Sequence, residues 1–367
     1  MPHNAPYGLT GTRRLNIGVL GCGPIAQAAH FESCTKSHNA TLYAICDVAE
    51  DLLARMAVTH GAQKTYTSYD AMLADPMVDA VIVATNDAFH VPAALQAVRA
   101  GKHVLCEKPL GVTVEEVEAL RREAHAHDRQ VMVGHMKRFD PGLQAARHFV
   151  THEMGEMLAY KGWYCDSTHR YAVTDAVQPL IVRSANTRKP ETDPKADLAR
   201  YYMLAHGSHL VDTARYFCGD IVSVDARLTR KFGAFCWFVT AEFASGAIGH
   251  LDLTVSVRMD WHEGVQIYGE HGSVLAKTFN PWRFTASDVE IFHEKSATYT
   301  RPLGADAQVY RRQVEAFADA VLQGRDVTTS GAAGIDDGIA AVRAMTAIVC
   351  SVETRSAVRL ADVTGGV

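Results

Sequence analysis

The sequence lacks three features that would each indicate a particular class of protein. Basic residues are not in excess, since 36 Lys and Arg stand against 41 Asp and Glu, which argues against a nucleic-acid partner. No apolar run approaches the length needed to cross a bilayer, so we expect no membrane partner. The polar start, residues 1–14, lacks the apolar core of a secretion signal, and we expect it to be a flexible arm of a cytoplasmic protein.

The eight cysteines include no Cys-x-x-Cys pair, so they indicate neither a redox motif nor a zinc site. Cys46 and Cys106 end apolar runs, which is typical of buried, reduced thiols in the cytoplasm. We therefore expect no metal. With 48% hydrophobic and 21% charged residues over 367 positions, the chain is long and apolar enough for two globular domains.

A glycine-rich turn follows the first strand-like run, residues 15–20, and a helical pattern begins inside the turn at Pro24. Gly21 permits a tight turn, Gly23 lets the backbone approach a diphosphate, and Ala26 lets the helix pack closely on the strand. The helix N-terminus then offers free N–H groups to phosphates. This G-x-G-x-x-A turn predicts a dinucleotide site formed by Gly21, Cys22, Gly23, Pro24, Ile25 and Ala26.

Asp47 ends a second strand-like run, residues 41–46. An acidic residue at this position accepts hydrogen bonds from the adenosine ribose and repels a 2′-phosphate, which predicts NAD rather than NADP. Asp47 and Glu50 also fit a capping box for a helix over residues 48–60, which Gly61 would end. Both interpretations stay open for this carboxylate.

Strands and helices continue to alternate, which predicts right-handed crossovers and a doubly wound parallel sheet. The strand-like runs and helical patterns fall, in chain order, at residues 80–84, 92–101, 103–106, 113–127 and 130–134. In such sheets ligands bind beyond the carboxyl ends of the strands. Asp47, Asn86, His90 and Lys108 all lie at or just after those ends, so we expect them to form one site.

Lys108 differs from an ordinary surface lysine. It follows a strand, and Pro109 keeps it out of the helical conformation. Glu107 precedes it, and the alternation of an extended segment directs the two side chains apart. A lysine that is shielded from water beside a positively charged nicotinamide gives up its proton more readily than an exposed one. Lys108 is therefore our candidate to exchange a proton with a substrate hydroxyl.

These motifs together resemble the glucose–fructose oxidoreductase / inositol dehydrogenase (Gfo/Idh/MocA) family. The resemblance is carried by Gly21–Ala26, Asp47, Val78–Asn86, His90, Ala100–Pro109 and Arg138–Pro141. It implies that Lys108 is the catalytic lysine of an NAD-dependent enzyme. It further implies that the nicotinamide half of the cofactor is lined by Thr85, Asn86, His90 and Glu107. We also expect Lys137 to contact both cofactor and substrate.

The pattern changes after residue 138, so we divide the chain into an NAD-binding Rossmann domain, residues 15–138, and a second domain, residues 139–367. The second domain is predicted to be α+β, with a large, mostly antiparallel open sheet. Its strand-like runs and final helices fall at residues 157–164, 221–228, 235–243, 247–255, 265–268, 308–322 and 334–352. The resembling family joins its subunits through this sheet, which implies a homo-oligomer, either a dimer or a tetramer.

A second cluster of candidate residues lies between these strands. His206, His209 and either Asp212 or Thr213 follow a helical spacing that places them on one side of a helix. A metal site, buried structural histidines and a catalytic His209 beside Lys108 are the three interpretations, and we favour the last. Many polyol dehydrogenases of the family carry an aspartate four residues before this histidine, where this chain has Ala205. That departure leaves Asp212 or His206 to replace the missing carboxylate.

Three functions are compatible with these residues. The first is a dehydrogenase or reductase that moves a hydride between NAD and a hydroxyl carbon of a sugar, a polyol or a sugar derivative. The second is an NAD-dependent glycoside hydrolase that oxidises transiently, eliminates, adds water and re-reduces. The third is a redox-sensing binding protein, which the intact Lys108 and His209 disfavour. An anionic sugar is one possible substrate, and the expected substrate contacts are Lys108, Lys137, Arg138, Trp163, Tyr164, Asp166, Arg183, His206 and His209.

Overall fold

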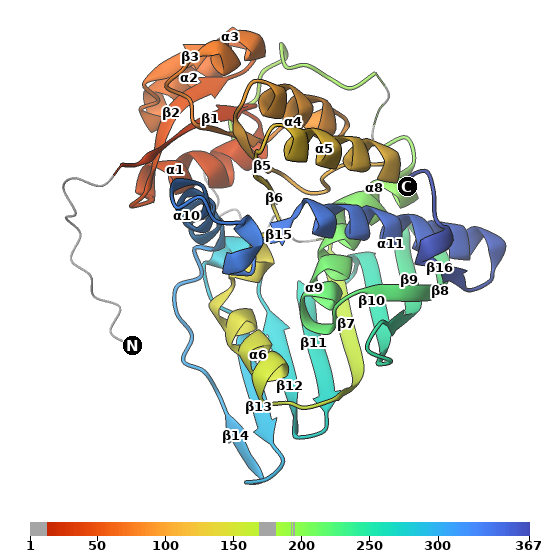
Figure 1. Ribbon diagram of the computed structural model, residues 1–367. Coiled ribbons are helices and arrows are strands. Elements are labelled where there is room, and N and C mark those ends of the chain that lie inside the picture. Colours follow the sequence, from red (N-terminus) through yellow and green to blue (C-terminus); the bar gives the residue numbers. More distant parts are fainter. Residues whose placement is uncertain (1–12, 169–180, 192, 194) are drawn as a thin grey trace.

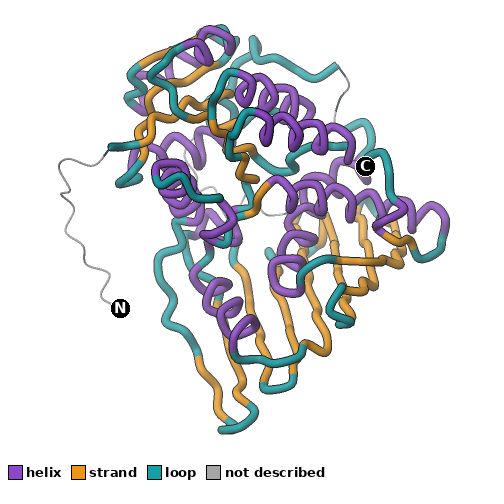
Figure 2. Tube along the Cα trace, in the orientation of Figure 1, coloured by secondary structure: helices purple, strands orange, loops and turns teal. Residues whose placement is uncertain are grey.

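The computed structural model describes residues 13–168, 181–191, 193 and 195–367, and it contains two sheets with helices packed against them (Figures 1 and 2). Most of the expected N-terminal arm lies outside the described residues. Within the described part of the chain, no helix is long and apolar enough to cross a membrane. All eight cysteines are free thiols, and six of them are buried, as the apolar runs predicted.

The first sheet has seven strands in the order β15-β6-β5-β4-β1-β2-β3, and every pair except the one that β15 makes is parallel. This is the predicted doubly wound sheet. Its parallel strands are β1 (Leu15–Leu20), β2 (Ala40–Cys46), β3 (Lys64–Tyr66), β4 (Ala80–Val83), β5 (His103–Cys106) and β6 (Val131–Val133). The short edge strand β3 was not predicted, because its side chains are largely exposed and it contains no apolar run.

Helices connect these strands on both faces of the sheet. They are η1 (Ala26–His30), α1 (Phe31–Lys36), α2 (Glu50–His60), α3 (Tyr69–Ala74), η2 (Asp87–Phe89), α4 (His90–Arg99) and α5 (Val114–Ala126). Thr113 and Glu116 form a capping box at the start of α5, within the helical pattern predicted over residues 113–127. Gly61 and Gly101 adopt the left-handed conformation just after α2 and α4, where the sequence predicted those helices to end.

The second sheet has nine strands in the order β14-β13-β12-β11-β7-β10-β9-β8-β16, and only the β7–β10 pair is parallel. The predicted mostly antiparallel sheet is confirmed. The strands are β7 (Met157–Ser167), β8 (Ile221–Lys231), β9 (Ala234–Phe243), β10 (Ile248–Val257), β11 (His262–Gly269), β12 (Gly272–Thr278), β13 (Asp288–His293), β14 (Thr298–Thr300) and β16 (Val358–Arg359). The turn between β9 and β10 contains Gly246 at a φ of +86°, a conformation that favours glycine.

One face of the second sheet is covered by helices α6, α9 and α11, and α11 also packs against α5 and β6 of the first domain (Figure 1). The remaining helical segments, in chain order, are η3 (Met136–Phe139), α6 (Pro141–His152), α8 (Leu198–Tyr202), η4 (Met203–Gly207), α9 (Ser208–Cys218), η5 (Pro281–Arg283), α10 (Val309–Leu322), η6 (Val327–Ser330), α11 (Ile335–Thr354) and η7 (Leu360–Asp362). A single apolar cluster includes side chains from both sheets and from α9 and α11, so the two halves share part of their core.

The chain returns to the first sheet near its end. Helix α10 packs against η1 and α1, and β15 (Ala333–Gly334) pairs with β6. The side-chain amide of Asn39 donates to the Glu315 carbonyl at 2.8 Å, which ties α10 to the start of β2. The division of the chain at residue 138 stays a prediction, and residues 309–334 contact the first sheet although they lie between β14 and β16 of the second sheet in sequence.

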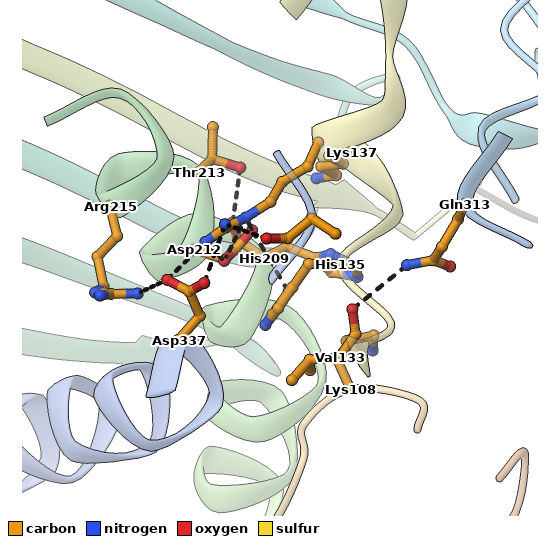
Figure 3. Close-up of polar contacts among 12 residues, drawn as sticks. Lys108, Val133, His135, Lys137, His209, Asp212, Thr213, Arg215, Gln313 and Asp337 are labelled. Carbon is orange, nitrogen blue, oxygen red and sulfur yellow. Dashed lines mark hydrogen bonds and ion pairs between the residues drawn. The ribbon is translucent and has the colours of Figure 1, made fainter. Parts of the chain in front are cut away.

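A buried ion network joins the end of the first sheet to the helices of the second. The Arg138 guanidinium donates to both carboxylate oxygens of Asp212, with a shortest distance of 2.6 Å. Asp337 accepts from Arg138 and also from Arg215, and Figure 3 shows the carboxylates of Asp212 and Asp337 near one another. Because Arg138 and Asp212 are each more than nine-tenths buried, either charge left alone would carry a large desolvation cost.

Replacing Asp212 should therefore destabilise the fold. We expect Asp212→Asn to lower the free energy of unfolding by about 3 kcal/mol, because Arg138 would keep its charge and lose its bidentate partner. Asp220→Asn is the control, since Asp220 also pairs with an arginine but its side chain is 71% exposed. Urea unfolding at neutral pH measures both. Equal losses in the two variants would contradict this assignment.

Candidate functional site

A groove runs along the carboxyl edge of the first sheet and has a volume of about 870 Å³. It is lined by the glycine-rich turn, by Asp47 after β2, and by residues 84–89 after β4. Lys108, which follows β5, also lines it. The sheet thus brings together the residues that the sequence placed at the strand ends, as expected for a parallel sheet.

The glycine-rich turn has the geometry that a dinucleotide requires. Gly21 has a φ of +94°, and a side chain there would come within 2.7 Å of the Ala84 carbonyl oxygen. A Cβ on Gly23 would instead project into open space, with no atom within 4 Å, so this glycine leaves room for a ligand in the groove. Ala26 is fully buried against the first sheet, while Pro24 and Ile25 line the groove. The residues present therefore fit a nicotinamide dinucleotide.

Asp47 holds the turn as well as lining the groove. One carboxylate oxygen accepts the Cys22 N–H at 2.7 Å, and the other accepts the Ala49 N–H at 2.9 Å. The capping box considered for Asp47 and Glu50 is wrong, because α2 begins at Glu50 and its N-cap residue is Ala49. Each carboxylate oxygen has a second lone pair, so these bonds leave Asp47 able to accept from a ribose.

Thr85, Asn86 and His90 follow β4, and His90 is the first residue of α4. The Asn86 side chain caps η2 by accepting the Ala88 N–H at 3.3 Å, and Thr85 lines the groove beside it. His90 is buried, and its Nδ1 and Nε2 lie 2.7 Å and 3.2 Å from the carbonyl oxygens of Pro109 and Thr85. His90 thereby connects the β4 loop to the loop that carries Lys108.

A second cavity, of about 280 Å³, adjoins the groove. Lys108, Thr85 and Ala205 line both spaces, so Lys108 lies where they meet. The Lys108 ammonium donates to the Ala205 carbonyl oxygen at 3.1 Å, across the boundary between the two halves of the molecule. Lys108 is half-buried.

Glu107 points away from Lys108, as the extended segment predicted. Its carboxylate pairs with His30 at 2.8 Å in the interior and also accepts the Lys108 N–H. Burial alone raises the pKa of Glu107, but the hydrogen bond and charge of His30 outweigh it, and the net pKa is lowered. Glu107 is therefore ionised at neutral pH and holds the Lys108 loop in place.

His209, at the start of α9, faces the second cavity near Lys108 (Figure 3). Burial first, and then the positive charges of Lys108 and Lys137, lower the pKa of His209 well below its ordinary value. The imidazole is therefore neutral at neutral pH and can accept or donate a hydrogen bond. Its ring stacks on Tyr164 with 5.9 Å between the ring centroids and 3° between the planes.

His206 lies one turn earlier, in the π-helical segment η4. Its Nε2 is 3.4 Å from an Asp166 carboxylate oxygen, and its Nδ1 is 3.2 Å from the Tyr164 hydroxyl. Asp166 belongs to β7, so a strand of the second sheet brings a carboxylate to the helix that carries Ala205. This pair lies beside the position where the family motif has its aspartate.

Asp212 does not line either cavity, although the sequence placed it among the catalytic candidates. Its carboxylate instead holds Arg138, which does not line the cavities either. Thr213, the next residue, donates its hydroxyl to the His209 carbonyl at 2.8 Å.

Lys137 lines the second cavity and is buried. It forms an ion pair with Glu263 of β11, and its ammonium lies 4.4 Å from the centroid of the Tyr164 ring. Burial lowers the pKa of Lys137 and raises that of Glu263, so each member depends on the other to stay charged. Of the other expected substrate contacts, Trp163 stacks on His262 and Arg183 is exposed, and neither lines the groove or the second cavity.

Part of the cavity wall was not predicted. It is formed by Tyr201, Trp261, Asn280, Pro281, Trp282 and Tyr310. Trp282 and Tyr310 stack with 14° between their planes, which gives the cavity a flat aromatic side. The Asn280-Pro-Trp282 sequence, an asparagine-capped turn, is the one local signal that could have indicated it. Among the described residues, no group of three or more His, Cys, Asp or Glu side chains could hold a metal ion.

Two family models match the chain. Residues 15–135 match the model described as an oxidoreductase family with an NAD-binding Rossmann fold. Residues 152–275 match the model of the GFO/IDH/MocA C-terminal domain. The two matches together span more than half of the chain, and they correspond to the first sheet and to most of the second.

Similar proteins of known sequence or structure agree with these matches. A myo-inositol 2-dehydrogenase of Thermotoga maritima is 28% identical over 96% of this chain and 100% of its own length. An uncharacterized oxidoreductase of Rhizobium meliloti is 32% identical over 84% of this chain and 90% of its own. The structure of a levoglucosan dehydrogenase, in complex with NADH and L-sorbose, has the same fold, with a TM-score of 0.78 at 20% identity over 95% of this chain and 99% of its own.

These relatives do not favour the glycoside hydrolase alternative. The matched models cover the groove that binds the dinucleotide and the sheet that carries the adjoining cavity. The chain belongs to the Gfo/Idh/MocA family of NAD-dependent oxidoreductases.

Proposed function

We propose that the protein moves a hydride between NAD and a hydroxyl-bearing carbon of a polyol or sugar. The observation that carries this proposal is the position of Lys108, which lines both the dinucleotide groove and the adjoining cavity. A substrate in that cavity would meet the cofactor beside this ammonium. The named relatives, which include several inositol 2-dehydrogenases and a D-xylose 1-dehydrogenase, support a hydroxylated ring as the substrate.

NAD, when bound, would accept the hydride. Residues of this chain would bind the substrate and transfer the proton. The Lys108 side chain takes the proton from the substrate hydroxyl, and the Ala205 carbonyl oxygen orients its nitrogen. The neutral His209 hydrogen-bonds the same hydroxyl from the other wall of the cavity. Trp282 and Tyr310 offer a flat face to the apolar side of a sugar ring.

The function is tested by incubating the protein with NAD and a panel of inositols, sugars and glycosides. Reduced nicotinamide and released aglycone are followed together. Lasting, stoichiometric reduction with an inositol or a sugar supports the proposal. Aglycone release without lasting reduction would identify a glycosidase instead, and binding of NAD with neither event would favour a sensor.

Lys108→Met should abolish turnover and leave cofactor binding intact. The methionine keeps most of the side-chain length without the amine, so we expect kcat to fall about a thousandfold. The dissociation constant for NADH, measured by fluorescence titration, should stay nearly unchanged. A variant with normal kcat would refute the role of Lys108.

We propose that the Asp166–His206 pair replaces the carboxylate that is missing at Ala205. Their side chains are each about nine-tenths buried beside the cavity, and Tyr164 links His206 to the ring of His209. In this arrangement His206 hydrogen-bonds a second substrate hydroxyl, and Asp166 fixes the tautomer of its ring.

Asp166→Asn and His206→Asn should each lower kcat/KM about a hundredfold, because the first leaves the imidazole without its carboxylate partner and the second removes the imidazole. The double variant should lose little more than either single one, as residues that act together are not additive. Asp252→Asn on the neighbouring strand β10 is the matched control and should retain its activity. Additive losses would argue that the two residues act separately.

We propose that Asp47 binds the adenosine ribose and disfavours NADP. Asp47→Asn keeps an acceptor for the turn but removes the charge, so the dissociation constant for NADH should rise about tenfold. NADPH should bind the variant better than it binds the natural protein, because the carboxylate no longer repels a 2′-phosphate. Titrations with both cofactors measure the ratio, and an unchanged ratio would contradict the role of Asp47.

We further propose a cytoplasmic homo-oligomer, either a dimer or a tetramer, formed through the open face of the second sheet. The free thiols support the location. Exposed apolar side chains along the sheet support the assembly, namely Leu158, Phe238, Ile248, Tyr268, Leu275 and Tyr299. Sedimentation velocity distinguishes the oligomer from a monomer.

A further inference from the structure

A segment that follows the second sheet's central strand β7 in sequence lies on the first domain. We call residues 181–188 the strap (light green in Figure 1). The Gln27 side chain fixes its start, since its amide donates to the Val182 carbonyl oxygen and its own oxygen accepts the Val182 N–H, both at 2.9 Å. The same amide donates to the Cys22 carbonyl at 2.8 Å, so one buried side chain ties the strap to the glycine-rich turn.

Two further contacts fix the course of the strap. The Ser184 hydroxyl donates to Asp51 in the first turn of α2 at 2.8 Å. Arg188 places its guanidinium 4.7 Å from the centroid of the Phe89 ring, in η2. Helix α2 follows β2 and η2 follows β4, while β1 lies between β2 and β4 in the sheet. Between Ser184 and Arg188 the strap therefore passes over the turn that follows β1.

The strap contributes directly to the groove. Thr187 and Arg188 line it together with Gly23 and Asp47. Among the described residues, the Arg188 guanidinium contacts the ring of Phe89 and forms no hydrogen bond or ion pair. A guanidinium presents five N–H donors in a planar fork that matches two phosphate oxygens. Arg188 is thus a cation with free donors on the wall of a site for a dianionic diphosphate.

We propose that Arg188 is a cofactor-binding residue and that it binds the diphosphate of NAD from the strap. The strap crosses the glycine-rich turn, which is the part of the site where the diphosphate lies. The N–H groups of the glycine-rich turn and of the helix after it would hold the diphosphate together with the guanidinium of the strap. Gln27 is the positioning residue, because it holds the strap to the turn without lining the groove. The inference rests on the cofactor groove and not on the substrate.

Binding measurements test the role of Arg188 independently of turnover. Arg188→Ala should raise the dissociation constant for NADH about tenfold, and Arg188→Lys should lie between the two because it keeps the charge without the fork. Arg183→Ala is the matched control, an exposed arginine of the same strap that does not line the groove. Fluorescence titration with NADH and with NADPH gives the constants.

The outcomes separate the possible partners of Arg188. A similar loss of affinity for NADH and NADPH supports contact with the diphosphate. A loss confined to NADPH would assign Arg188 to a 2′-phosphate, and an unchanged affinity for both would show that it does not touch the cofactor; either result overturns the proposal. These dissociation constants do not depend on turnover by the Lys108 variant. The proposed function and the proposed role of Arg188 can therefore be refuted separately.

Hydrogen exchange tests the positioning by Gln27. The Val182 amide should exchange slowly in the natural protein and faster in Gln27→Ala, since that substitution removes its acceptor. NADH should slow exchange across residues 181–188 in the natural protein and not in Arg188→Ala. The double variant Gln27→Ala/Arg188→Ala should bind NADH no more weakly than Arg188→Ala alone. Additive losses, or protection by NADH that persists without Arg188, would refute the coupling.

Discussion

The ion pair between Arg138 and Asp212 sets the distance between the two halves of the candidate site. Arg138 follows the last parallel strand of the first sheet, and Asp212 lies one turn after His209 on α9. Because both charges are buried, the pair is stable only when its bidentate geometry is complete. That geometry holds α9 against the first domain, and it thereby places His209 near Lys108. Asp212 acts on the site through this packing rather than from inside the cavity.

The same packing also affects the surroundings of Ala205, the position where many polyol dehydrogenases of the family carry an aspartate. Losing a side-chain carboxylate there leaves the backbone carbonyl to meet the Lys108 ammonium. The carboxylate that adjoins the site comes from Asp166 instead, on a strand of the second sheet, and it reaches the cavity through His206. The π-helical segment η4 places His206 and His209 on the cavity side of a nearly continuous helix. The chemistry proposed for this chain is therefore a rearrangement of the family's site.

The strap is a second connection between the two domains, because it brings residues of the second domain to the groove of the first. The second domain contributes residues to the dinucleotide groove through residues 181–188, as the first domain contributes Lys108 to the substrate cavity. Gln27 connects the two, since its side-chain amide donates to both the glycine-rich turn and the strap. A cofactor held by both domains would be bound in a fixed relation to the substrate cavity. This relation matters because hydride transfer requires the reacting atoms to be closely placed.

The sequence by itself determined the elements and residues whose cause is local. The alternation of apolar runs specified the parallel sheet, the positive φ at Gly21 required a glycine, and Thr113 with Glu116 specified where α5 begins. Lys108 was identifiable because parallel strands end at a common edge, where ligands bind.

Tertiary structure decided the features that depend on residues far apart in the chain. Helical spacing alone could not show that Asp212 turns toward Arg138, because the partner lies 74 positions earlier. The pairing of Asp166 with His206, the wall formed by Trp261 and Trp282, and the course of the strap likewise depend on how the two sheets pack. Hydrophobic periodicity predicts which face of a helix or strand is buried. Which neighbouring element covers that face depends on the packing of the whole chain.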